Sequence, residues 1–492
     1  MQKAKTTSLK ANVVMNMIYE VFLIIIPFIT GPYISRVLHA DGVGTESYLT
    51  SLLSYFSMFA TLGTASYGAY CIARNREDKK ELSKAFWEIE ILSLITGGIM
   101  IIAWVIFATA YKQYTTLMYI QTLNLLGTAL SISWLFAGLE KFQYNIIIST
   151  IIRILGVVCM FLFVKSPADL WIHIAITAFS TLFSVLSLWV FAPKFISFCK
   201  IDWNSIFKIR LKETLVYFIP TIATSIYTVL DKTLIGIITQ DSFQNGYYEQ
   251  ASKIINMAKT VSFSAIHGVM VPRSSFYFKK NDEEKSKELA IQDYKIISFL
   301  SVGIAFGIAV IAKTFVPIFF GAGYEPTIYI MYILCAVIPI IGLSNALGSI
   351  YYTPSGRRMQ STWYLLAGSV TNLILNICLI PLWSAYGAAI ATVIAESVIT
   401  FLYVRNAGKF ISAKWIAKIY WKKIAAGLVM LISCFIYERF VSGRINTFFV
   451  LSSEIVLGAI IYISVLALLK DSSITLGVHY LKGKMKGLTK NG

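Results

Sequence analysis

Long apolar segments recur along the whole chain, separated by short polar turns. Each segment is a continuous apolar run, and about 20 apolar residues cross the ~30 Å hydrocarbon core of a bilayer. A transmembrane β-barrel would instead show alternating apolar and polar positions. The pattern therefore predicts an all-α polytopic membrane protein with about 14 transmembrane helices. The predicted spans are 12–37, 44–72, 86–110, 114–138, 142–164, 169–192, 213–239, 247–272, 293–320, 326–352, 361–381, 385–405, 421–440 and 446–469.

The spacing of the spans predicts two halves. A longer basic linker, 193–212, follows the sixth span, and because six is even, both halves begin on the same side of the membrane. This is the arrangement of a parallel repeat related by an axis along the membrane normal. We expect an N-terminal lobe at 1–192 and a C-terminal lobe at 213–405. Segment 406–420 reads as an interfacial amphipathic helix, and 421–492 as two further helices with a basic tail.

Composition supports a membrane protein and explains the charge. Of 492 residues, 57% are hydrophobic and 14% are charged, and the mean hydropathy is +0.69. The net charge of +18 comes mostly from Lys and Arg in the termini and alternate loops. Because basic residues concentrate on the cytoplasmic side, both termini are predicted to be cytoplasmic. The basic excess is thus a topology signal, and nucleic acid is not an expected partner.

One predicted helical hairpin, Leu215 to Arg273, carries charge where lipid is expected. A charge at the bilayer centre costs about 2.5–3.5 kcal/mol on insertion scales, so such residues face a protein interior or a water-filled cavity. At 100° per residue, the polar residues of the second segment share one face, with Lys259 at its edge. That stripe contains Glu249, Lys253, Asn256, Thr260, Ser264 and His267. Residues Thr221, Ser225, Thr228 and Lys232 form a similar stripe on the first segment.

The sign of the deep charges suggests the kind of ligand. Cations outnumber clearly deep anions, and Arg and Lys pair well with phosphate. The candidate substrate-binding cations are Arg36, Arg153, Lys232, Lys253 and Lys259. Four carboxylates are candidates for coupling to H⁺ or Na⁺, namely Asp231, Glu20, Glu249 and Glu396. A structural role remains open for two of these carboxylates. Asp231 could form a salt bridge between helices, and Glu249 could extend its side chain toward the nearby turn.

Catalytic and metal-binding motifs are absent from the sequence. It contains no Walker A sequence, no GxGxxG and no His/Cys ligand cluster, and its six cysteines are scattered. We therefore expect no enzyme activity, no metal and no cofactor other than a coupling ion. The energy for transport would come from an ion gradient, the membrane potential or the substrate gradient.

Several segments resemble the bacterial polysaccharide flippase (Wzx/RfbX-like) family of the multidrug/oligosaccharidyl-lipid/polysaccharide exporter superfamily. They are PYISRVLHADGVGTESY (Pro32 to Tyr48), LGTASYGAYCIAR (Leu62 to Arg74), GYYEQASKI (Gly246 to Ile254) and VMVPR (Val269 to Arg273). One departure is His39, where the family pattern leads us to expect glycine.

The resemblance implies two six-helix lobes around a central cavity, with two additional C-terminal helices. It also implies a function, the movement of undecaprenyl-pyrophosphate-linked oligosaccharides from the inner to the outer leaflet of the bacterial cytoplasmic membrane by alternating access. The cations named above and Asn256 would contact the substrate, and tyrosines such as Tyr48 would stack on sugar rings. A glycan polymerase and other assembly proteins are implied partners.

Three other functions stay open at this point. A lipid II flippase and a cation-coupled multidrug exporter belong to the same superfamily. A membrane glycan polymerase or ligase would need a large outer loop with catalytic groups, and no loop of that size is present.

Overall fold

The computed structural model describes residues 9–280, 282–408, 410–441 and 443–474. Within these ranges the side chains of 9–18, 20, 21, 23, 24, 219–221, 223–227 and 264–269 are not described. Every regular element in the described residues is helical, and nine described segments are long and apolar enough to cross a membrane. The predicted class is confirmed, although this count does not establish the number of spans as 14. The chain forms two compact units, Met1–Thr233 and Leu234–Gly492.

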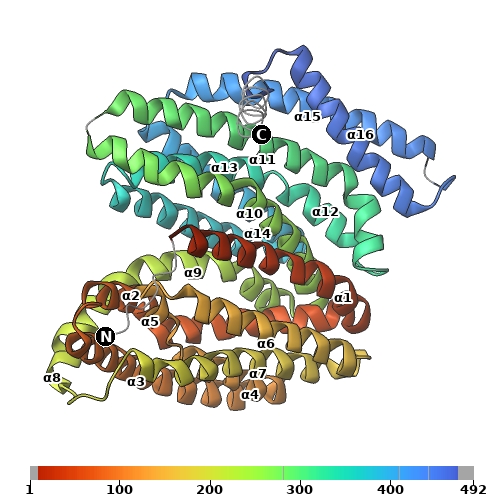
Figure 1. The fold of residues 1–492 in the computed structure, drawn as a ribbon. Helices are drawn as coiled ribbons and strands as arrows, with labels where there is room; N and C mark the ends of the chain where they lie inside the picture. Colours follow the sequence, from red (N-terminus) through yellow and green to blue (C-terminus); the bar gives the residue numbers. More distant parts are fainter. Residues whose placement is uncertain (1–8, 281, 409, 442, 475–492) are drawn as a thin grey trace, which may run out of the picture. The chain divides into compact units, whose positions relative to one another are not determined.

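The first unit is a set of long helices joined by tight turns (Figure 1). Its main helices are α1 (Leu9–Thr61), α2 (Thr64–Arg74), α3 (Lys79–Tyr111), α4 (Thr115–Ala129), α5 (Ser133–Gly138), α6 (Phe142–Phe163) and α7 (Leu170–Phe191). A short α8 (Trp203–Ser205) and a π-helical turn η3 (Ile206–Arg210) lead into α9 (Leu211–Thr239). The unit boundary lies inside α9, whereas the sequence predicts a division at 193–212.

Contacts of α9 explain why most of it packs with the first unit. The ring of Phe218 lies 5.5 Å from that of Phe59, and Thr233 Oγ1 donates to Ser51 Oγ at 2.9 Å. Gly63, between α1 and α2, has φ 79°, and a Cβ there would lie 2.9 Å from the backbone nitrogen of Phe218. Glycine therefore supplies both the left-handed turn and the close approach of α9.

A sharp bend at His39 divides α1 between the predicted spans 12–37 and 44–72, the second of which continues into α2. His39 has φ 56° and ψ −179°, a region populated almost only by glycine. This conformation explains why the family pattern favours glycine at this position. Figure 1 shows α1 turning back on itself at its right-hand end. The later helix α14 (Arg358–Asn406) contains a similar break at Ser384, where φ is 49°, between the predicted spans 361–381 and 385–405.

The linker after α7 is held by a buried polar network. The Arg210 guanidinium donates through Nε to Glu88 Oε2 at 2.8 Å and through Nη1 to the Tyr67 hydroxyl at 3.0 Å. Tyr67 also donates to Glu213, and Ser205 Oγ donates to Glu88 Oε2 at 3.1 Å. Glu88 is 1% exposed, so its charge is stabilised by these donors. The network fixes the start of α9 on α2 and α3.

The described residues of the second unit form seven further α-helices. They are α10 (Ser242–Lys279), α11 (Glu283–Phe319), the short pair α12 (Glu325–Leu334) and α13 (Val337–Leu347), α14, and the C-terminal α15 (Ala413–Val441) and α16 (Thr447–Leu468). A π-helical turn η4 (Gly348–Tyr352) extends α13. The α-helix of the predicted span 326–352 is thus interrupted at Cys335 and Ala336, between α12 and α13.

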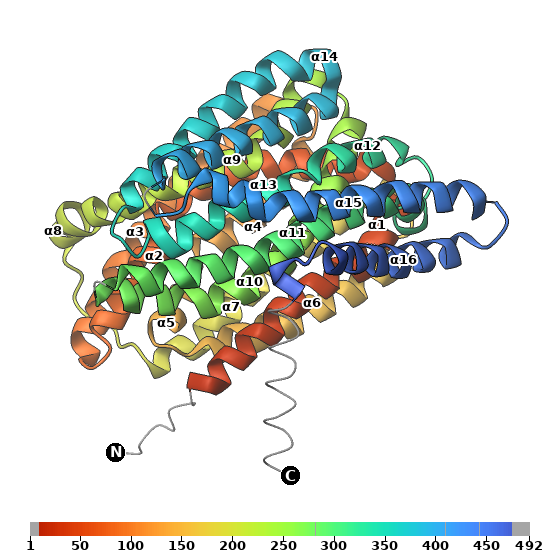
Figure 2. The same cartoon turned by 90° about the horizontal axis from the view of Figure 1, so that it is seen from above.

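The C-terminal helices α15 and α16 pack on each other and on α11, and Figure 2 shows them side by side. The Tyr462 hydroxyl donates to the carbonyl of Phe299 at 3.0 Å, and a Cβ on Gly427 would lie 2.3 Å from the Phe306 ring. Helix α15 runs without a break from Ala413 through 420. The predicted separate interfacial helix at 406–420 is therefore continuous with the following span, apart from the turn that precedes Ala413.

A buried ion pair joins the first part of α15 to the segment that follows α16. Lys423 Nζ lies 2.9 Å from Asp471 Oδ2 and 3.1 Å from Oδ1, and it also donates to the Ile419 carbonyl at 3.2 Å. Lys423 is 0% exposed and Asp471 is 4% exposed. The segment that follows α16 is thereby tied to α15.

We predict that Lys423→Met lowers the melting temperature of the detergent-solubilised protein. Removing one partner leaves the Asp471 carboxylate buried without its counter-charge, at a cost of about 3–5 kcal/mol. Lys423→Met combined with Asp471→Leu should recover much of the loss. Lys285→Met, which removes an exposed Lys285–Asp282 pair, is the matched control and should have little effect. Equal losses in the two single variants would contradict this role.

Candidate substrate site

The end of α9 places Asp231 and Thr233 in the interior of the first unit. Both are buried, and the hydroxyl of Thr233 bonds to Ser51 on α1. Lys232, between them, is half-buried. Both Asp231 and Lys232 take part in further interactions, so neither is free of partners. Their neighbours Thr221 and Ser225 from the predicted stripe lie outside the described side chains.

Helix α10 carries the predicted stripe of the second unit. Glu249 Oε1 accepts from Lys253 Nζ at 3.3 Å, which confirms the predicted i,i+4 pair. Glu249 is buried, whereas 46% of the Lys253 side chain is exposed, and Asn256 one turn on is also exposed. The pair thus holds a lysine whose amine reaches an accessible surface. Ser264 and His267 lie outside the described side chains.

Lys259 lies farther along α10 and is less exposed than Lys253. Lys259 interacts electrostatically with Glu396, a buried carboxylate on α14. The two residues that the sequence assigns to substrate contact and to ion coupling are therefore brought together within the second unit.

Three other predicted site residues have different surroundings. Arg36 is exposed near the bend of α1 and has partners. Tyr48 is 6% exposed, and its hydroxyl lies 2.8 Å from that of Tyr111 in a core cluster with Leu49 and Trp104. A ring in this position offers no face to a sugar, so Tyr48 is left out of the function proposed below. Glu20 lies outside the described side chains.

Arg153 lines a groove in the first unit whose lining includes six hydroxyl side chains. The groove has a volume of about 390 Å³ and lies between α1, α6 and α7. Arg153 is exposed and lies near the middle of α6, a helix long enough to span a membrane. Among the residues that the structure describes, no hydrogen bond or ion pair to its guanidinium is present. It is thus unlike Lys253 and Lys259, each of which has an acidic neighbour.

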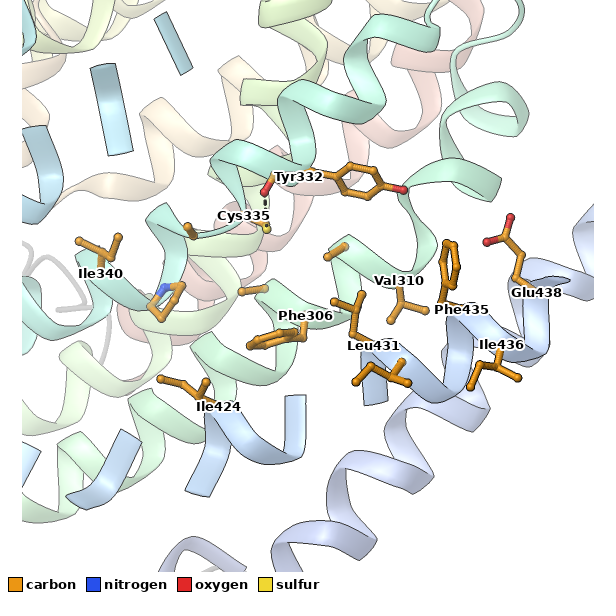
Figure 3. Close-up of a pocket in the computed structure, with 15 residues that line it drawn as sticks. Phe306, Val310, Tyr332, Cys335, Ile340, Ile424, Leu431, Phe435, Ile436 and Glu438 are labelled. Carbon is orange, nitrogen blue, oxygen red and sulfur yellow. Dashed lines mark hydrogen bonds between the residues drawn. The ribbon is translucent and has the colours of Figure 1, made fainter. Parts of the chain in front are cut away.

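The second unit contains a larger groove of a different character. Its volume is about 770 Å³, and its lining side chains come from α11, α12, α13 and α15. Figure 3 shows mostly apolar groups, with Glu438 at one end. Glu438 lies 2.8 Å from Lys313 Nζ. This lining does not suit a sugar or a phosphate, since it offers few hydrogen-bonding groups. No group of three metal-ligating side chains occurs within the described part of the chain.

Several buried charged groups were not identified from the sequence. Glu88, Lys423 and Asp471 belong to the structural networks described above. Asp293 on α11 and Glu90 on α3 are fully buried with no hydrogen-bond partner in the described residues. The sequence pattern was sufficient to identify these two acids, since each lies within or beside an apolar run. The ion pair of His173 Nε2 with Glu46 Oε2, at 3.2 Å, had no such signal because its partners are distant in sequence.

A comparison with protein families decides the affiliation. The model for a family described as polysaccharide biosynthesis protein matches residues 9–278, more than half of the chain. The chain belongs to this family. The match covers the first unit from residue 9 onward, the whole of α9, and α10 except for its last residue.

Curated relatives of this polysaccharide biosynthesis protein are named for transport. A protein of Shigella dysenteriae, named as an O-antigen transporter, is 24% identical over 408 residues, which cover 81% of this chain and 99% of the relative. A similarly named Escherichia coli protein is 22% identical over 409 residues, covering 81% and 97%. A protein of Haloferax volcanii, named as a low-salt glycan biosynthesis flippase, is 28% identical over 248 residues, covering about half of each chain (49% and 50%). The expectation of a non-enzyme agrees with these names.

Solved structures show the same fold. The lipid II flippase MurJ in an inward closed conformation matches with a TM-score of 0.74 at 15% identity, covering 93% of this chain and 98% of MurJ. A multidrug resistance MATE family transporter in an inward-facing conformation matches with a TM-score of 0.57 at 12% identity, covering 80% and 94%. The protein is therefore a multi-pass helical membrane protein of the flippase and exporter fold.

Arg153 has no partner among the residues that the structure describes, and this observation generates a test of its role. We predict that Arg153→Met leaves the melting temperature in detergent unchanged or raises it, because an uncompensated charge is removed from a membrane helix. Lys259→Met is the contrasting variant and should lower the melting temperature, because it removes a positive charge that interacts with the buried Glu396 carboxylate. A large loss of stability in Arg153→Met would show that the arginine is a structural residue.

Proposed function

We propose that this protein is a flippase for lipid-linked oligosaccharides. It moves units carried on undecaprenyl pyrophosphate from the inner to the outer leaflet of the bacterial cytoplasmic membrane, where they enter surface polysaccharide biosynthesis. Membership of the polysaccharide biosynthesis protein family supports the pathway, and the names of the relatives support the transport step. A glycan polymerase and other assembly proteins would act on the product.

The observation that carries this proposal is the accessible cation within membrane-spanning helices. Arg153 lines a groove that contains six hydroxyl side chains, and Lys253 exposes nearly half of its side chain beside the buried Glu249. An exposed cation at membrane depth must face water or an anionic ligand. The pyrophosphate of a lipid-linked glycan is such a ligand, and Arg and Lys are its usual partners. Arg36, Lys232, Lys259 and Asn256 complete the proposed set of substrate contacts.

The proposed mechanism is alternating access between two lobes that form a parallel repeat. The head group would bind to the cations while the polyprenyl chain stays in the bilayer. The distribution of basic residues supports a cytoplasmic position for both termini. The large apolar groove of the second unit does not compete for the head group, because its lining is unsuited to phosphate.

A lipid II flippase is the nearest alternative, since its substrate has the same polyprenyl pyrophosphate. The likeness to MurJ is at 15% identity and shows the fold alone, so it does not favour lipid II. A multidrug exporter for organic cations is disfavoured by exposed cations in the helices. Complementation separates these functions, because each flippase restores a different polymer.

We predict that Lys253→Ala abolishes surface polymer in cells that depend on this protein. A lost charged hydrogen bond to substrate reduces binding by about tenfold or more. Surface polymer is measured by glycan blotting, and protein in the membrane fraction by immunoblotting. Lys285→Ala, at an exposed pair, is the matched control. Normal polymer in Lys253→Ala at equal protein level would remove Lys253 from the site.

Energy coupling yields a separate prediction. Asp231, Glu249, Glu396 and Glu20 are proposed to bind the coupling ion, H⁺ or Na⁺, because a carboxylate at membrane depth changes its charge cheaply by binding a cation. Dissipating the H⁺ or the Na⁺ gradient with a selective ionophore should stop translocation in proteoliposomes. Translocation that continues at the same rate without either gradient would contradict coupling.

A further inference from the structure

The groove between α1, α6 and α7 has a wall of hydroxyl groups. Helices α6 and α7 lie side by side in the first unit, as Figure 1 shows. The hydroxyl-bearing lining residues are Thr30, Ser149, Thr177, Ser180, Thr181 and Ser184. The groove follows α6 from Ser149 to Met160, or about 16 Å at 1.5 Å per residue. Its volume of about 390 Å³ is near the lower end of the range for small-ligand sites, about 300–1,000 Å³.

Several hydroxyls of this wall already donate hydrogen bonds within the protein, so their oxygen atoms remain available as acceptors. Thr177 donates to the carbonyl of Ile174 at 2.8 Å, and Thr181 donates to that of Thr177 at 3.0 Å. Ser149 and Ser184 share a bond of 3.1 Å across the two helices. A hydroxyl that donates to its own helix keeps its oxygen lone pairs for a ligand. A wall of this kind suits a ligand with many O–H donors, which is the character of a sugar.

Gly156 leaves space for the Ser180 hydroxyl at the centre of the wall. A Cβ at this position would lie 2.7 Å from Ser180 Oγ and 3.8 Å from Ile176 Cγ2. The clash would fall on the end of a short side chain that can rotate, so alanine at this position would displace the hydroxyl while the helix packing is kept. This glycine is therefore a means of changing the groove without unfolding the protein.

Charge is concentrated at one position in the groove. Arg153 lies one turn from Gly156 on α6, and no acid pairs with it among the described residues. His173 also lines the groove, and its contact with Glu46 ties α7 to the part of α1 that follows the bend at His39. A cation beside an acceptor-rich wall fits a ligand that combines an anionic group with neighbouring hydroxyls.

We propose that this groove is a subsite for the sugar next to the pyrophosphate of the lipid-linked substrate. The α7 hydroxyls, with Ser180 at the centre, accept hydrogen bonds from the sugar, and Arg153 binds the adjoining phosphate oxygens. The inference rests on the proposed function and assigns to Thr177, Ser180 and Ser184 the selection among glycans.

The test is photo-crosslinking in cells whose surface polymer depends on this protein. A photoreactive amino acid replaces Ile176, which lines the groove, or Phe179, which is 45% exposed on another face of α7. Adducts are analysed by mass spectrometry for a covalently attached glycolipid. We expect sugar-bearing adducts at Ile176 and none at Phe179.

Substitutions make the test specific for the wall. Gly156→Ala in the Ile176 background should reduce the sugar-bearing adduct by roughly threefold to tenfold, which corresponds to one hydrogen bond. Gly98→Ala is the matched control, since a Cβ there meets no atom within 4 Å. Absence of glycan adducts at Ile176, or equal yields with and without Gly156→Ala, overturns the subsite while surface polymer still reports the proposed function. A strain whose polymer is unaffected by loss of the protein overturns the proposed function itself.

Discussion

The free energy of placing a charge in hydrocarbon constrains this molecule more than any other term. A charged side chain in a membrane helix must be paired within the protein or must face water or a ligand. Most of the buried charges described above meet the first condition. Lys423 with Asp471 and Arg210 with Glu88 are compact networks whose donors and acceptors lie within 3.2 Å. Their role is to tie helix ends together.

Arg153 and Lys253 meet the second condition. Lys253 is anchored by Glu249 yet reaches an accessible surface, and Arg153 faces a groove whose other polar groups are six hydroxyls and the His173 imidazole. The distinction between paired and accessible charges therefore separates stabilising residues from candidate substrate contacts. It also explains why the larger of the two grooves described above is not the candidate site, since its lining is almost entirely apolar.

The sequence was sufficient for the fold class and for local geometry. Hydropathy predicted a helical membrane protein, and helical spacing predicted the Glu249–Lys253 pair. It was insufficient where the partners are far apart in the chain. Glu88 and Arg210 are separated by 122 residues, and Lys423 and Asp471 by 48, so no local pattern marks them. Tyr48 illustrates the same limit, because a tyrosine near a polar turn can face a ligand or the core, and its contact with Tyr111 depends on tertiary packing.

The account is tested most directly by measuring translocation in proteoliposomes that contain the purified protein and a labelled undecaprenyl-pyrophosphate-linked oligosaccharide. A membrane-impermeant reagent that modifies the sugar reports the fraction of substrate in the outer leaflet. The account predicts that the wild-type protein makes the inner-leaflet substrate accessible over time, and that Lys253→Ala does not. An accessible fraction that matches protein-free liposomes, with folded wild-type protein present and an ion gradient applied, would contradict it.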